Sequence, residues 1–90
     1  MFVQKVYYQP VADRLVLAGT TEGRAPVPGG SIDLPRELKG PGWVPIADVQ
    51  TVPFADGLRT CVVLAYQVVE GAPLMEFSWL EGRILDTRPP

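Results

Sequence analysis

Histidine is absent from the 90-residue chain, and cysteine occurs once, as Cys61. Histidine is the commonest metal ligand and the side chain best suited to proton transfer near neutral pH. Its absence excludes Ser–His and Cys–His nucleophilic catalysis and removes the usual Cys/His zinc sites. A single cysteine cannot form a disulfide within the chain. Because Cys61 lies in the most apolar segment, where burial raises a thiol pKa, we expect it to be structural and unreactive.

The chain also lacks an excess of charge and a long apolar run. Eight Lys and Arg against ten Asp and Glu give a formal net charge of −2, unlike the basic surfaces that bind nucleic acids electrostatically. No apolar run approaches the roughly 20 residues of a membrane span. Residues 1–10 have neither the apolar core nor the cleavage site of a signal peptide. We therefore expect a soluble cytoplasmic protein with no membrane contact.

The acidic residues and the glycines show no pattern typical of a catalytic or ligand site. The ten acids are spread almost evenly from Asp13 to Asp86, as on a solvated surface. The glycines do not open a helix and precede no Gly-Lys-Ser/Thr sequence, so turns and β-bulges explain them better than a phosphate loop does. The sequence predicts no metal, no cofactor and no catalytic residue, which favours a protein that is not an enzyme.

Strand formers and chain breakers dominate what is present. Valine is the commonest residue, with 12 copies, and glycine and proline together account for 19 of the 90 residues. Valine favours strands, and turn signals recur about every 8–12 residues, as in sandwiches and barrels. We predict an all-β fold, a small closed or partly open β-barrel of six to seven short, mainly antiparallel strands. It would form one domain over residues 1–87, with a frayed tail at residues 88–90.

Apolar alternation and turn residues place the individual strands. Extended segments are expected at residues 2–9, 14–22, 31–34, 43–52, 58–69 and 74–80, before residues 83–87 end the fold. The first two form a hairpin. Pro35 can begin one helical turn, and Pro45, which has no N–H, places the start of its strand at an edge or a strand end. Segment 58–69 is apolar on both sides, so we expect a central strand covered on both faces.

Aromatic side chains are the candidates for an interaction surface, because tyrosine and tryptophan are favoured at protein interfaces. The adjacent residues Tyr7 and Tyr8 must face opposite sides of a strand, so at least one lies exposed or at the barrel rim. Packing in the core is the structural alternative for any of these rings. The interaction candidates are Tyr7, Tyr8, Trp43 and Trp79.

A resemblance to one family covers about Phe2 to Leu85. The residues that carry it are Leu15–Gly23, Val27–Leu34, Ile46–Val49, Ala55–Leu58, Val62–Tyr66 and Trp79–Leu85. This order of glycines and apolar residues resembles the second-domain β-barrel of translational GTPases such as elongation factor Tu. In that family the barrel packs on the GTPase domain and helps to hold the aminoacyl end of tRNA or ribosomal RNA. The chain departs from the family in having no P-loop, additional prolines and a longer loop before Ser31, and no RNA-contacting residue can be carried over.

Several functions remain open. The first is a non-catalytic interaction or assembly module on a translation-factor-like barrel, docking on another protein or on itself. The second is an RNA- or ribosome-associated accessory domain, which would need its basic residues gathered on one face. Its RNA-contact candidates are Lys5, Arg14, Arg24 and Arg83. A small enzyme that uses carboxylates is the third, and the remainder is a ligand-binding barrel, whose small interior argues against a large ligand.

Overall fold

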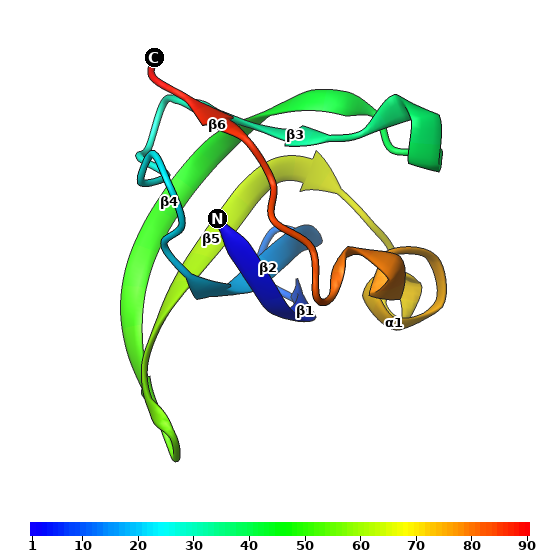
Figure 1. The fold of residues 1–90 in the computed structure, drawn as a ribbon. Coiled ribbons are helices and arrows are strands. Elements are labelled where there is room, and N and C mark those ends of the chain that lie inside the picture. The colour runs from blue at the N-terminus through cyan, green and yellow to red at the C-terminus, as the bar shows by residue number, and fades with distance from the viewer.

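Six antiparallel strands form one sheet in the computed structural model, which describes residues 1–90 (Figure 1). The elements are β1 (Phe2–Gln9), β2 (Arg14–Thr20), β3 (Ser31–Leu34), the 3-10 turn η1 (Arg36–Leu38), β4 (Gly42–Phe54), β5 (Gly57–Gln67), α1 (Ala72–Glu76), the 3-10 turn η2 (Ser78–Leu80) and β6 (Thr87–Arg88). The strand order is β1-β2-β5-β4-β3-β6. The sheet curls around one core without closing into a continuous ladder, so the predicted all-β, partly open barrel is confirmed.

The core lies on the concave side of the sheet. Alternation along each strand sends every second side chain inward, most regularly in β3 and the first half of β4. The fully buried large side chains are Met1, Val3, Leu15, Leu17, Ile32, Leu34, Val62, Leu64 and Leu80. Burying each is worth about 1.5–3 kcal/mol, which is the main stabilisation available to a domain without a disulfide.

Residues 81–88, which we call the closing segment, lie between β1 and β3 and include β6 (Figure 1). On the β1 side, the Val3 N–H donates to the Arg83 carbonyl at 2.9 Å. On the β3 side, the Asp33 N–H donates to the Asp86 carbonyl, also at 2.9 Å. Arg88 then pairs with Ser31, so β6 extends one residue into the segment that we expected to fray. The open barrel is thus bridged by main-chain hydrogen bonds from an irregular segment.

A β-bulge between Val3 and Lys5 shifts the register of β1 against β2. Gly19 lies opposite the bulge, and a Cβ atom there would overlap the Phe2 carbonyl oxygen. Only glycine permits so close a main-chain approach. The expectation that glycines serve bulges is confirmed at this position.

Pro45 lies in the part of β4 that pairs with one neighbour only. Residues 42–45 pair with β3, whereas pairing with β5 begins at Ile46. The Ile46 N–H donates to the Gly30 carbonyl at 2.8 Å, so the nitrogen of Pro45, one residue earlier, points away from β3. Of the two predicted positions, an edge or a strand end, the edge is confirmed, and the missing donor costs no ladder hydrogen bond.

β5 is central, between β2 and β4, as predicted. Its expected coverage on both faces is only partly correct. Val63 is 8% exposed on the face opposite the core, but Ala65 on that face is exposed and Cys61 is half-buried there rather than part of the core. Leu58 is 69% exposed, because the β4–β5 hairpin projects beyond the body of the domain (Figure 1).

The strand predicted over residues 74–80 is wrong, because the segment forms α1 and η2. Gly71 adopts a positive φ of 91° before the helix, and Pro73 occupies its first turn, where the missing N–H has no intrahelical role. Phe77 and Leu80, three residues apart, are both buried against the barrel. Met75, Phe77 and Trp79 alternate with polar residues, as in a strand. The segment is too short for this spacing to distinguish the two-residue period of a strand from the 3.6-residue period of a helix.

Candidate functional site

Tyr7 and Tyr8 face opposite sides of β1, as expected for neighbours in a strand. Tyr7 is 41% exposed on the outer face. Tyr8 is half-buried at the rim, and its hydroxyl donates to Oδ1 of Asp13 in the β1–β2 turn. This hydrogen bond raises the pKa of Tyr8, since the bond requires the protonated phenol.

The two tryptophans are exposed to different degrees and belong to different parts of the barrel. Trp43, on β4, is 40% exposed, and the guanidinium carbon of Arg88 lies 4.2 Å from its ring centroid. Trp79, in η2, is half-buried, and its Nε1 donates to the Glu76 carbonyl at 2.8 Å. Trp79 therefore belongs to the α1 end of the barrel, as Tyr8 does through its contact with the turn at Asp13.

The basic RNA-contact candidates are not gathered by any contact between them. Lys5 pairs with Ala18 on β2, and Arg14 lies four residues further along that strand, a distance of roughly 13 Å at the usual rise per residue. Arg83 is held in place because its Nε donates to the Trp79 carbonyl at 2.9 Å. Arg24 lies in the loop before β3, where its carbonyl accepts a hydrogen bond from Thr87 Oγ1.

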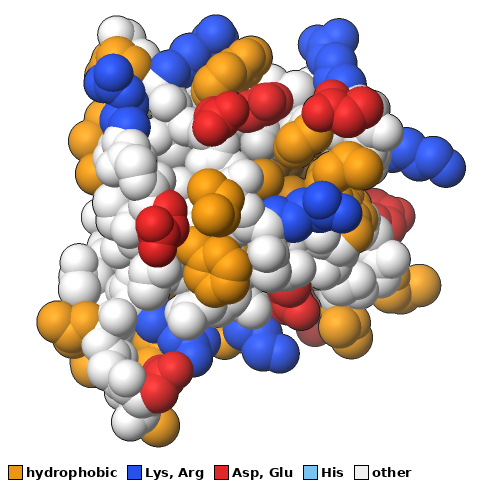
Figure 2. Space-filling model, viewed as in Figure 1, with side chains coloured by type: hydrophobic (Ala, Val, Ile, Leu, Met, Phe, Trp, Pro, Cys, Tyr) orange, Lys and Arg blue, Asp and Glu red, His pale blue; other side chains and the backbone are white.

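Three highly exposed apolar side chains lie on and just before α1. Val69 is 73% exposed, Leu74 is 75% exposed and Met75 is 83% exposed, and we call these three residues the α1 surface. Hydrophobic side chains reach the exterior in the corner of Figure 2 where α1 lies. The Met75 N–H donates to the Gly71 carbonyl at 3.0 Å, which fixes the helical turn that presents Leu74 and Met75 to solvent.

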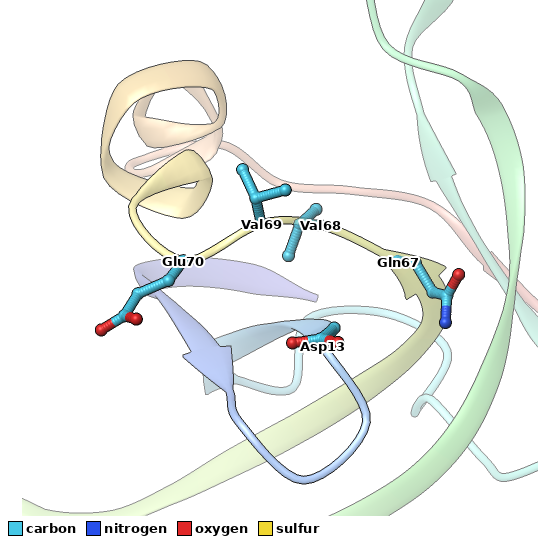
Figure 3. Close-up of a pocket in the computed structure, with 5 residues that line it drawn as sticks. All are labelled: Asp13, Gln67, Val68, Val69 and Glu70. Atoms are coloured by element: carbon cyan, nitrogen blue, oxygen red, sulfur yellow. The ribbon is translucent and has the colours of Figure 1, made fainter.

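A pocket of about 380 Å³ adjoins the α1 surface and is lined by Asp13, Gln67, Val68, Val69 and Glu70 (Figure 3). The Val68 N–H donates to the Asp13 carbonyl at 2.7 Å, which ties the β1–β2 turn to the segment that leads into α1. In Figure 3 the Val68 side chain points toward Asp13, whereas Val69 points to the opposite side. The pocket therefore has an apolar wall and carboxylates contributed by two separate segments.

A second pocket, of about 300 Å³, lies between the loop at residues 22–24 and the closing segment at residues 84–87. The Met1 amino group donates nearby to the carbonyls of Glu22, at 3.1 Å, and Leu85, at 2.8 Å. Burial lowers the pKa of this amino group, against the opposing charges of Asp86 and Glu22. The pocket thus adjoins contacts that hold the two ends of the described chain together.

No protein-family model, curated protein or solved structure matches the chain. No group of three or more His, Cys, Asp or Glu side chains is placed to hold a metal ion. None of the helices has the length and apolar character needed to cross a membrane. The protein is therefore defined by its architecture, an all-β, partly open barrel with one short helix at its end.

The sequence pattern does not reveal the α1 surface, because it predicts a strand over residues 74–80. In that assignment Met75 shares a face with Phe77 and Trp79, whereas the structure buries Phe77 and exposes Met75. Proline at the start of a segment and the good helix formers Leu74, Met75 and Glu76 were available signals for a helical turn. They identify the turn, but not which side of it faces solvent.

Proposed function

We propose that this protein is a non-catalytic interaction module that binds another protein, or a second copy of itself, through the α1 surface. The observation that carries the proposal is the exposure of Leu74 and Met75, at 75% and 83%, on consecutive positions of one ordered turn. Single exposed apolar residues are normal on protein surfaces. Two adjacent ones, with the exposed Val69 five residues before them, are typical of a surface that a partner covers.

The energetic argument is one of burial. Covering an exposed leucine or methionine side chain is worth about 1.5–3 kcal/mol, and a few such anchors dominate most interfaces. α1 packs on β1 and η2, and its own residues Ala72 and Pro73 are buried, as is Phe77 directly after it. A surface that is already ordered loses little conformational entropy when a partner binds. Tyr8 and Trp79, two of the four aromatic candidates, lie at this same end of the barrel.

The resemblance to the second-domain barrel of translational GTPases supports the proposal, since that barrel packs on another domain. A cytoplasmic location is part of the same proposal. The roles of Tyr7 and Trp43 as interaction residues remain predictions.

The test is capture of a partner and measurement of mass in solution with matched variants. The double variant Leu74→Glu/Met75→Glu should lose the partner, or the dimer, that the unaltered protein forms. Leu58→Glu, at a leucine that is 69% exposed on the projecting hairpin, should keep it. A protein that is strictly monomeric and without a partner at micromolar concentration would contradict the proposal. Measurable tRNA binding that weakens as salt is raised would instead favour the RNA-associated alternative.

A further inference from the structure

We propose that the α1 surface and the pocket beside it accept a segment of a partner protein in which an arginine or lysine stands next to apolar side chains. This inference rests on the proposed function and adds the chemistry of the partner. The basic side chain would enter the pocket at Asp13, with Glu70 at the pocket edge, while the apolar side chains would cover Leu74 and Met75.

The charged side chains that line the pocket are both acidic, although Arg14 borders it through its pairing with Gln67. Two segments form this corner, residues 10–13 and residues 67–76, and together they contain three acids, Asp13, Glu70 and Glu76, and no lysine or arginine. None of these acids forms an ion pair, because the single ion pair of the structure joins Arg59 to Asp56. A cationic partner would therefore meet carboxylates that no residue of this chain neutralises by direct contact.

The pocket can hold one long side chain. Its volume of about 380 Å³ is at the lower end of the roughly 300–1,000 Å³ typical of small-ligand sites. Oδ1 of Asp13 accepts the Tyr8 hydroxyl, while Oδ2 accepts no hydrogen bond from the protein and is available to a ligand. Figure 3 shows the Glu70 side chain directed away from Asp13, so a guanidinium would donate to Asp13 while Glu70 adds negative charge at the edge of the pocket.

Apolar side chains of this chain would also contact the bound segment, in addition to the carboxylates. Val68 lines the pocket and points toward Asp13 (Figure 3), so the methylene groups of a bound arginine or lysine would lie on its side chain. Leu74 and Met75 follow within seven residues of Val68 and are open to solvent. Apolar neighbours of the basic residue can cover them. Methionine adapts its shape readily to such neighbours.

Two basic residues of this chain border the corner and do not fill it. Arg14 pairs with Gln67 across β2 and β5 but does not line the pocket. Arg83 is occupied by the Trp79 carbonyl, and its guanidinium carbon lies 5.9 Å from the Trp79 ring centroid. Neither forms an ion pair with the acids of the pocket, so the site keeps its negative charge.

The experiment is a titration of the isotope-labelled protein, followed by backbone amide shifts, with N-acetyl-leucyl-arginine amide and with N-acetyl-leucyl-glutamate amide. The arginine peptide should shift the amides of residue 13 and residues 67–76, with an affinity that falls as salt is added. The glutamate peptide should bind about tenfold more weakly or not at all, since a charged hydrogen bond is worth at least that ratio.

Matched variants locate the charge effect. Glu70→Gln and Asp13→Asn should each weaken the arginine peptide several-fold, and asparagine tolerates the positive φ of 52° at position 13. Glu37→Gln, on the exposed turn η1, removes the same charge elsewhere and should leave binding unchanged. Equal binding of both peptides, shifts outside this corner, or no binding would overturn the inference. Loss of partner capture in the Leu74→Glu/Met75→Glu variant could still occur in each of those cases, so the proposed function would survive separately.

Discussion

Met1 and Leu85 exchange a pair of main-chain hydrogen bonds across 84 residues of sequence. The Leu85 N–H donates to the Met1 carbonyl at 2.8 Å, and the Met1 amino group donates to the Leu85 carbonyl at 2.8 Å. The bond between Val3 and Arg83 continues this contact along β1. The closing segment therefore protects one edge of the sheet, which would otherwise be open to pairing with other chains.

Leu85→Ala should lower the free energy of unfolding by about 2–5 kcal/mol, because Leu85 is 3% exposed and its removal leaves a cavity under the closing segment. Its neighbour Ile84 is 66% exposed, and Ile84→Ala should change stability by less than about 0.5 kcal/mol. Urea denaturation of both variants measures the difference. Equal effects would show that the closing segment does not hold the core in the way described.

Gly19→Ala should destabilise the protein by at least about 2 kcal/mol, because the new methyl group overlaps the Phe2 carbonyl oxygen across β1 and β2. Gly23 provides the comparison, since its φ is 72° and no atom lies within 4 Å of an added Cβ. Gly23→Ala should cost about 1 kcal/mol, from the left-handed backbone alone. Thermal or urea unfolding gives both values, and a neutral Gly19→Ala would argue against the bulge.

The Tyr8–Asp13 hydrogen bond should make stability depend on pH in the alkaline range. In the folded protein the pKa of the Tyr8 phenol is raised above the ordinary value of 10.0. The folded protein therefore holds the phenol proton more tightly than the unfolded chain does. The contribution of the hydrogen bond to the free energy of unfolding is complete below pH 10.0 and is lost as pH rises through the raised pKa. Subtracting the ultraviolet titration of Tyr8→Phe from that of the unaltered protein isolates Tyr8. Asp13→Asn should lower its pKa, and an unchanged titration would rule out the bond.

Cys61 should react more slowly with iodoacetamide in the folded protein than in the urea-unfolded chain at the same pH. Burial raises the pKa of its thiol, and the charge of Arg59 opposes that shift only in part. The thiol contribution to stability is complete below the ordinary pKa of 9.0 and declines as pH rises through the folded-state value. Cys61→Ala should remove this part of the pH dependence. Equal reaction rates in the folded and unfolded states would contradict the claim that burial raises the pKa of the Cys61 thiol.

Local patterns were sufficient to predict most of the sheet. Segments 2–9 and 31–34 reappear as β1 and β3 with the same bounds. Alternation is strict in β3, whereas the bulge in β1 brings both Val3 and Val6 into the core. Pro35 immediately precedes η1, and Asp56 lies in the turn between β4 and β5. In each case the chemistry of neighbouring residues decides the structure.

The α1 end and the closing segment could not be predicted in the same way. Residues 74–80 are too few for apolar spacing to distinguish a strand from two short turns. The closing segment depends on contacts such as Asp33 with Asp86, which join residues distant in sequence and leave no local signal. The candidate site could not be predicted from local patterns either, because the exposure of Leu74 and Met75 depends on which side of α1 packs against β1.

Site-specific photo-crosslinking tests the central claim, binding through the α1 surface, most directly. A benzophenone amino acid replaces Leu74 in one variant and Leu58, on the projecting hairpin, in the other, and both are expressed in the native host. We predict one dominant covalent product, with a single partner or with a second copy of the chain, from position 74 and none of that mass from position 58. The same products from both positions, or no product from position 74, would contradict the claim.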